Sequence, residues 1–194
     1  MKNNKTVIGL TGSMASGKGT AALYLQKKYG ASTYRFSDML ADLLDRLYLE
    51  HTRDNFIKLS EMIRGTFGED IMAKTMARDV TKDPNRIIVV EGVRRLADIE
   101  YLKRLEGFAL AEIFADIKTR YERMTKRSEK TDDQTKTFAE FEADHQRSTE
   151  LSIIEVARQA TERVDNNGSL DELYRQLDDL IRRLSFPRKR ESST

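Results

Sequence analysis

The sequence predicts an α/β fold in which a parallel β-sheet is covered by helices on both faces. Apolar runs typical of strands alternate with helical patterns along the chain, and this alternation is typical of parallel sheets. Ile87–Glu91 is a continuous β-branched run that ends in an acid, which indicates a strand buried on both faces. Gly12–Thr20 is a glycine-bounded segment between an apolar run and a helical pattern. These three observations place a ligand-binding loop at the start of the fold.

Length and composition limit the organisation of the chain. Its 194 residues suit one α/β domain, which we expect over 1–184, with a disordered tail at 185–194. The formal net charge of +2 gives no general attraction for nucleic acid or an acidic membrane. The absence of cysteine excludes disulfides and thiolate metal sites and suits the cytoplasm. No apolar segment is long enough to span a bilayer. We therefore expect a cytoplasmic protein without nucleic-acid or membrane partners.

The remaining elements follow from apolar periodicity and from capping residues. Further strands are expected at 7–10, 31–36, 108–114 and 163–165, and helices at 21–29, 37–44, 52–67, 69–80, 96–105, 118–127, 138–161 and 170–184. Ser37 and Asp38 are expected to cap one helix, and Ser169 to cap the last. The region 37–83 is helical and longer than one crossover requires, so we expect a substrate-holding insert there. Ser128–Lys136 is polar and is expected to be a mobile loop.

The glycine-bounded segment has the residues of a phosphate-binding loop. Its members are Gly12, Ser13, Met14, Ala15, Ser16, Gly17, Lys18, Gly19 and Thr20. The Gly-x4-Gly-Lys spacing lets backbone N–H groups converge on phosphate oxygens, and the following helix adds partial positive charge at its N-terminus. Lys18 adds a full charge, and the hydroxyl comes at Thr20 rather than directly after the lysine. The segment therefore predicts binding of a nucleotide phosphate.

These motifs resemble those of the P-loop small-molecule kinases over most of the chain. The chain is most similar to an uncharacterised group of small P-loop kinases near dephospho-CoA kinase and adenylate kinase. The segment from Ile8 to Thr20 matches its phosphate loop, including the Gly-Lys-Gly-Thr ending. The resemblance implies a P-loop NTPase fold with five parallel strands, a helical acceptor-binding insert, a short lid, and ATP and Mg²⁺ as cofactors.

The acceptor side of the resemblance rests on two segments. Phe36–Leu40 resembles the start of the monophosphate-binding helix of adenylate kinase, but Ala41 stands where that family has an arginine. Glu91–Arg95 is similar to an Asp-Gly-Phe-Pro-Arg segment and places Arg95 on the acceptor arginine. The charge missing at position 41 could come from one of three other arginines, Arg35, Arg46 or Arg64. Arg64 matches a basic position of the uncharacterised group.

The donor side is completed by a lid at about 120–137 and by a turn after the last strand. Arg123 and Arg127 lie four residues apart on one helical face and can reach the same anion. The resemblance assigns both to catalysis, adds Arg147 as a substrate contact, and places Asp132-Asp133 in the lid. It also implies that Asn167 and Gly168 line the adenine pocket.

Each role has a plainer alternative. Lys18 would bridge the donor phosphates, and Thr20 would contact a phosphate or the water shell of Mg²⁺. Glu91 would orient Mg²⁺-bound water, or it is an ordinary carboxylate at the end of a strand. Asp38 is either the base near the acceptor or only a helix cap. The arginines, Arg94 among them, could be solvated surface residues, as could both histidines.

Three functions remain open at this point. The first is ATP- and Mg²⁺-dependent phosphoryl transfer to a small phosphorylated acceptor, above all a nucleoside monophosphate. The second is dephospho-CoA kinase activity, in which the acceptor group is a ribose hydroxyl. The third is an ATP-binding regulatory switch. The sequence leaves the base preference open and allows a monomer or a homodimer.

Overall fold

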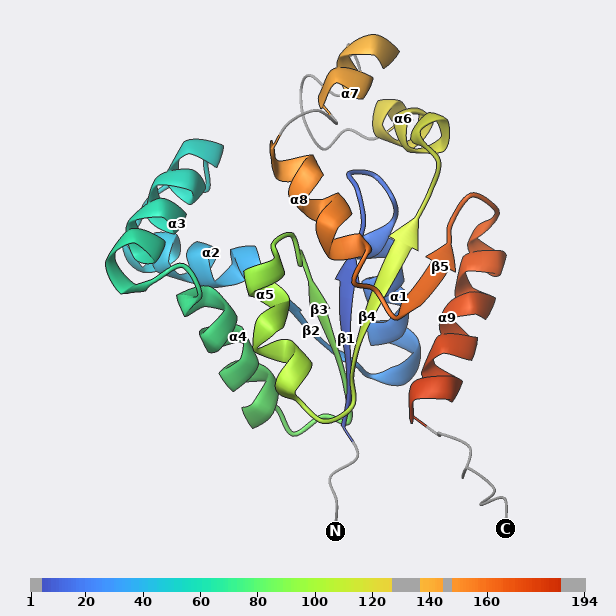
Figure 1. Ribbon diagram of the computed structural model, residues 1–194, viewed down its shortest axis with the longest axis horizontal. Helices are drawn as coiled ribbons and strands as arrows, with labels where there is room; N and C mark the ends of the chain where they lie inside the picture. The colour runs from blue at the N-terminus through green and yellow to red at the C-terminus, as the bar shows by residue number, and fades with distance from the viewer. Residues whose placement is uncertain (1–4, 127–136, 145–147, 186–194) are drawn as a thin grey trace.

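The computed structural model describes residues 5–126, 137–144 and 148–185 and has a single parallel sheet at its centre (Figure 1). The strands are β1 (Thr6–Thr11), β2 (Ser32–Arg35), β3 (Ile87–Glu91), β4 (Phe108–Phe114) and β5 (Glu162–Asp165). They pair in the order β2-β3-β1-β4-β5, and every pair is parallel. The predicted five-stranded parallel sheet is therefore confirmed.

Helices cover both faces of the sheet because successive strand residues point to opposite sides. On β1, Ile8 and Leu10 pack with helices α1 (Lys18–Tyr29) and α9 (Leu170–Ser185). Val7 packs on the other face, in a cluster with side chains of α2 (Phe36–Arg46), α4 (Ile71–Lys82), α5 (Leu96–Glu100) and α8 (Ser148–Ala157). This two-sided burial explains why the strands read as continuous apolar runs. No helix in the described part of the chain is long and apolar enough to cross a membrane.

The predicted insert between β2 and β3 consists of α2, α3 (Arg53–Phe67) and α4. Figure 1 shows α2 and α3 standing to one side of the sheet. The expected capping by Ser37 and Asp38 is wrong, because α2 begins at Phe36 with Arg35 at its N-cap position and no side-chain cap. Phe36 is buried, and the chain turns directly from β2 into the helix at this ring. Asp38 instead lies in the first turn, where its charge complements the helix dipole.

The second half of the chain differs from the expectation in two places. The helix expected over 138–161 is described as α7 (Phe138–Asp144) and α8, which ends at Ala157. It ends there because the N–H and hydroxyl of Thr161 donate to the carbonyl of Leu110, at 2.9 and 3.4 Å, and lead into β5. The helix expected over 96–105 is α5 followed by the 3-10 turn η1 (Leu102–Arg104). The predicted loop at 128–136 lies outside the described residues. The predicted tail at 185–194 also lies outside them except for Ser185, which is the last residue of α9 and not part of a tail.

One face of the sheet carries a polar link between its two helices. Asp178 of α9 accepts hydrogen bonds from the hydroxyls of Tyr24 and Tyr29 at 2.8 and 2.7 Å, and from Lys28 Nζ at 2.7 Å. Burial alone would raise the pKa of Asp178, but the hydrogen bonds from Lys28, Tyr29 and Tyr24 outweigh it and hold this pKa below 3.8. The link therefore stabilises the packing of α1 on α9 while the carboxylate is ionised.

This link predicts a pH effect on stability. Because the pKa of Asp178 is lower in the folded protein, its contribution is complete above the ordinary value of 3.8 and is lost as the pH falls through the folded value. Asp178→Asn should therefore lower the free energy of unfolding at pH 7 by about 1 kcal/mol. The difference from wild type should shrink below about pH 4. Urea unfolding at pH 7 and pH 3 measures both effects, and an equal difference at the two pH values would contradict the assignment.

Candidate functional site

The segment between β1 and α1 forms a loop that only glycine permits at its two ends. Gly12 has φ +141° and Gly17 has φ +101°, both in the region that side chains rarely adopt. A Cβ at Gly12 would also collide with the carbonyl oxygen of Ile113 on β4. The helix α1 then starts at Lys18. The N-terminus of α1 thus opens at the carboxyl edge of the sheet, where anions bind in this class of fold.

The polar groups of the loop suit a phosphate. Lys18 Nζ donates to the carbonyl oxygens of Gly12 at 2.6 Å and Ser13 at 3.0 Å, so the ammonium lies over the loop. Ser16 is 1% exposed, and its Oγ has no hydrogen-bond partner among the described residues. A buried hydroxyl of this kind is costly unless a ligand satisfies it. The loop, the ammonium and the helix N-terminus therefore fit the phosphates of a nucleotide.

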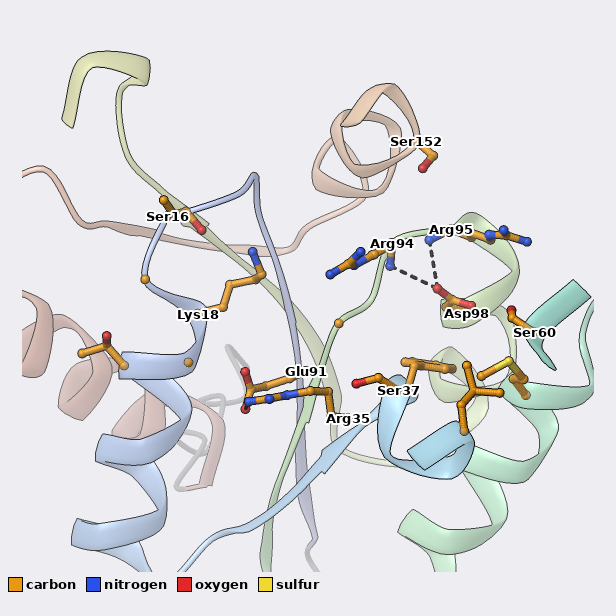
Figure 2. A pocket seen from close by; sticks show the side chains of 18 of the residues that line it. Ser16, Lys18, Arg35, Ser37, Ser60, Glu91, Arg94, Arg95, Asp98 and Ser152 are labelled. Atoms are coloured by element: carbon orange, nitrogen blue, oxygen red, sulfur yellow. Dashed lines mark hydrogen bonds and ion pairs between the residues drawn. The ribbon is translucent and has the colours of Figure 1, made fainter. Parts of the chain in front are cut away.

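A cavity of about 1020 Å³ extends from this loop to the helical insert (Figure 2). Lys18 and Thr20 line one side, and Phe36, Leu40 and Met72 provide apolar lining on the insert side. The charged lining residues are Lys18, Arg35, Arg64, Glu91, Arg94, Arg95 and Asp98. Away from Lys18 there are four guanidinium groups and two carboxylates, and Arg95 also pairs with Glu69 next to the lining, so one positive charge is in excess. The cavity thus carries positive charge both at the loop and at the arginines.

Glu91 ends β3 on the floor of the cavity. It is 8% exposed, and its Oε1 accepts a hydrogen bond from Arg35 Nη2 at 3.1 Å. Its Oε2 faces the start of α1, since a Cβ on Gly19 would lie 3.8 Å from this oxygen. The alternative of a solvent-facing carboxylate is therefore wrong for Glu91. With the hydroxyl of Thr20 on α1, Glu91 supplies the hard oxygen groups that suit Mg²⁺ held through water.

The segment after β3 is fixed by a buried carboxylate. Asp98 is 3% exposed, and its Oδ2 accepts the backbone N–H groups of Arg94 and Arg95 at 3.1 and 3.0 Å. Burial raises the pKa of Asp98, although these hydrogen bonds oppose the effect. Figure 2 shows the Arg94 side chain extending into the cavity toward Lys18, whereas the Arg95 side chain extends the opposite way. Arg95 Nη1 lies 3.5 Å from Glu69 Oε2.

Arg64 lies in the wall of the cavity. It is 9% exposed, and burial lowers its pKa. Its Nη1 donates to the Glu69 carbonyl at 2.6 Å, its Nε donates to Ser60 Oγ at 3.3 Å, and its Nη2 lies 3.8 Å from Asp98 Oδ1. These contacts join the end of α3 to α5. Arg64 therefore holds the insert against the segment that carries Arg94 and Arg95.

The helix α6 (Ile117–Lys126) lies over the phosphate loop. Met124 packs with Ala15 and with Phe141 of α7. Arg120 is 6% exposed, and its Nη1 donates to the Met14 carbonyl at 3.3 Å. The predicted lid therefore begins with a helix docked on the loop.

Of the remaining predicted site residues, some lie where α6 meets the turn after β5, and the others lie outside the cavity lining or outside the described residues. Arg123 Nη2 donates to Asn166 Oδ1 at 3.5 Å, and Asn167 Oδ1 accepts the N–H of Asp116 at 2.8 Å, so the turn after β5 touches α6. Gly168 belongs to the same turn. Asp38 is exposed and does not line the cavity. Arg127 and Arg147 lie outside the described residues.

Sequence reasoning assigned no role of their own to three buried polar residues of the site, Asp98, Arg120 and Asn166. Asp98 had a usable signal, since an acid three residues after an N-cap position is typical of a capping box. Arg120 had none, because one arginine in a charged helix cannot be told from its neighbours. Asn166 stands within the turn that the resemblance picked out, but its amide bonds to a loop 150 positions earlier in the chain.

The fold and the loop together define the class of this protein as a P-loop kinase-like protein. Its five parallel strands and the glycine-bounded loop between β1 and α1 are the features that place it in that class.

The chain belongs to the AAA domain family, whose model matches residues 11–142. It is similar to UPF0200 proteins of three archaea. The identity is 26% for Staphylothermus marinus, over 84% of this chain and 85% of the relative. The identity is 26% for Methanothermobacter thermautotrophicus, over 94% of this chain and 92% of the relative. The identity is 30% for Methanosarcina barkeri, over 65% of this chain and 68% of the relative.

Two solved structures share the fold. The structure of TT1252 from Thermus thermophilus superposes with a TM-score of 0.60 at 20% identity, covering 93% of this chain and 98% of that one. A shikimate kinase from Bacteroides thetaiotaomicron superposes with a TM-score of 0.62 at 14% identity, covering 91% and 96%. At these identities the likeness establishes the fold, and the predicted P-loop kinase architecture is confirmed.

Proposed function

We propose that the protein transfers a phosphoryl group from ATP, with Mg²⁺, to a small phosphorylated acceptor, and that this acceptor is a nucleoside monophosphate. The observation that carries the proposal is the single cavity that joins the phosphate loop to the arginine-lined wall. Phosphoryl transfer needs donor and acceptor in one water-restricted space with positive charge around the moving group. The predicted cytoplasmic location and the monomer or homodimer state stay predictions.

The charge of the acceptor side supports a phosphorylated acceptor. One positive charge remains in excess when Glu91, Asp98 and Glu69, the partner of Arg95, are counted against the four arginines. A phosphate monoester carries about −1.5 to −2 at neutral pH, so it would use this excess and could also draw Arg95 from Glu69. A neutral hydroxyl acceptor would leave it uncompensated. The charge balance therefore favours an acceptor phosphate over the hydroxyl of a neutral molecule.

The residues take distinct roles in this proposal. Lys18, Ser16 and the backbone from Gly12 to Gly19 hold the donor phosphates, and Arg123 adds charge from α6. Thr20 and Glu91 would hold Mg²⁺ through water, and the ion would supply positive charge next to the donor phosphates.

On the acceptor side, Arg94 and Arg95 contact the acceptor phosphate, and Arg64 positions them through Asp98. Asp38, Arg127 and Arg147 remain predicted substrate or catalytic contacts. Asn167 and Gly168 remain the predicted contacts of the adenine.

Dephospho-CoA kinase activity is the alternative within the same chemistry, and an ATP-dependent switch is the alternative outside it. Dephospho-CoA also carries phosphate groups, so the excess charge does not by itself separate it from a nucleoside monophosphate. The switch requires ATP binding without acceptor turnover. Both alternatives are separated from the proposal by the identity of the product.

The test is ADP formation from ATP and Mg²⁺ in the presence of AMP, CMP, GMP, UMP or dephospho-CoA, with shikimate as a hydroxyl acceptor control. We expect at least one nucleoside monophosphate to accelerate ADP formation and to yield the nucleoside diphosphate by chromatography. Acceleration by dephospho-CoA alone would replace the proposal with the second function. ATP binding with no acceleration by any acceptor would favour the switch.

A further inference from the structure

The side chain of Asn166 lies between the phosphate loop and α6, the helix with which the predicted lid begins and which we call the lid helix. Asn166 directly follows β5, and its backbone N–H donates to the Phe114 carbonyl at 2.7 Å, which fixes its position on the sheet. The residue is 4% exposed. Its Nδ2 donates to the carbonyl oxygen of Ser16 at 2.8 Å. A buried side-chain amide of this kind holds the loop backbone in one conformation.

The opposite end of the same amide faces the lid helix. Asn166 Oδ1 accepts a hydrogen bond from Arg123 Nη2 at 3.5 Å. On the loop side, a Cβ at Gly17 would collide with Asn166 Nδ2, so the amide packs directly on the last loop residue before α1. The donor end of one planar group thus contacts the loop, and the acceptor end contacts an arginine of α6. An aspartate could not donate to Ser16, and an aliphatic residue could contact neither partner in this way.

We infer that Asn166 is a positioning residue that couples the phosphate loop to the lid helix, so that the loop and the Arg123 guanidinium act on the same triphosphate as one unit. The inference rests on the proposed function in that Arg123 must face the donor phosphates. A second link supports the coupling, since Arg120 of α6 donates to the Met14 carbonyl of the loop. Two buried polar side chains therefore join the loop to its surroundings on the lid side.

The test is a double-mutant cycle read by calorimetry with Mg²⁺ and a non-hydrolysable ATP analogue. The four proteins are wild type, Asn166→Ala, Arg123→Ala and the double variant. Each single change should weaken analogue binding about tenfold, which is typical for loss of a hydrogen bond to a charged group. If Asn166 acts through Arg123, the double variant should lose little more than either single variant, roughly twentyfold in total.

A matched control separates this role from general loosening of the turn. Gln176 of α9 holds the same turn, because its Oε1 accepts the N–H of Asp165 at 2.9 Å and its Nε2 donates to the Asp165 carbonyl at 2.6 Å. It has no hydrogen bond to Ser16 or Arg123 among those described. Gln176→Ala should therefore keep the wild-type affinity for the analogue. Thermal unfolding of every variant shows whether it is folded, so that the analogue affinities of folded proteins are compared.

The outcomes separate the inference from the proposed function. Failure of the wild-type protein to bind the analogue would overturn both. If the wild-type protein binds the analogue and the two single losses of affinity multiply to about a hundredfold in the double variant, only the coupling would be overturned. An equal loss in Gln176→Ala would also overturn it, because the turn and not the amide would then matter. If Asn166→Ala does not fold, Asn166→Ser replaces it in the same cycle.

Discussion

Lys18→Ala is expected to leave a folded protein with almost no transferase activity. Lys18 Nζ lies over the phosphate loop, 2.6 and 3.0 Å from the carbonyl oxygens of Gly12 and Ser13. In the proposed reaction this ammonium would exchange these carbonyls for donor phosphate oxygens. Loss of a comparable preorganised charge reduces the rate by roughly a hundred- to a thousandfold. ADP formation with the best acceptor of the panel measures the effect.

Two controls make this result specific. Lys27 lies on the same helix and is exposed, so Lys27→Ala removes the same charge from α1 without touching the loop and should keep the wild-type rate. Lys18→Met keeps most of the side-chain length and should be as inactive as the alanine variant. Circular dichroism and thermal unfolding show whether each variant is folded. A folded Lys18→Ala protein with the wild-type rate would contradict the proposed role of the loop.

The features that could be predicted from the sequence are those that depend on neighbouring residues. The loop follows from the spacing of Gly12, Gly17 and Lys18, because the backbone must curl there and no longer-range contact is needed. The strand Ile87–Glu91 has its predicted bounds, since a β-branched run buried on both faces has few alternatives. The cap at Ser169 is also confirmed, because its partner Glu172 is three residues away and their hydrogen bonds are local.

The features that could not be predicted depend on tertiary contacts. Ser37 and Asp38 carry a capping pattern, but burial of Phe36 moves the start of α2 toward the strand. The helix expected to continue to position 161 ends at Ala157, since Thr161 bonds to a strand fifty-one residues earlier. The contact between Asn166 and Ser16 spans most of the chain and has no local signal.

The opposite directions of the Arg94 and Arg95 side chains are another feature that could not be predicted from the sequence. They have a functional consequence. Their backbone N–H groups are held by one carboxylate, Asp98, which fixes where each side chain leaves the chain. Arg94 extends into the cavity toward Lys18, and Arg95 extends the opposite way, away from Lys18 (Figure 2). Arg95 is half exposed and lies beside Glu69, so it must leave this surface pair to reach an acceptor. The resemblance pointed to Arg95, and the geometry adds Arg94 as a nearer contact.

Arg94→Ala is therefore expected to weaken acceptor binding more than Arg95→Ala does. Truncation of an arginine that pairs with a buried phosphate costs about 2 kcal/mol or more, roughly thirtyfold in affinity. Arg95→Ala should reduce the acceptor affinity only about fivefold. Arg95 is half exposed, and an exposed ion pair contributes little free energy. Arg95 must also give up its pair with Glu69 when it binds the acceptor, which offsets part of its contribution. Calorimetry with the acceptor and with an ATP analogue, titrated separately, measures both. The analogue affinity should stay near the wild-type value in both variants.

A third arginine provides the control for both variants. Arg104 is exposed, pairs with Glu100 at 3.0 Å and does not line the cavity, so Arg104→Ala should leave both affinities unchanged. Arg94→Lys should recover only part of the acceptor affinity, since a point charge cannot reproduce two parallel hydrogen bonds to a phosphate. A larger loss in Arg95→Ala than in Arg94→Ala would restore Arg95 as the main acceptor contact. Unchanged acceptor binding in both would remove the arginine wall from the acceptor site, and with it the charge argument for a phosphorylated acceptor.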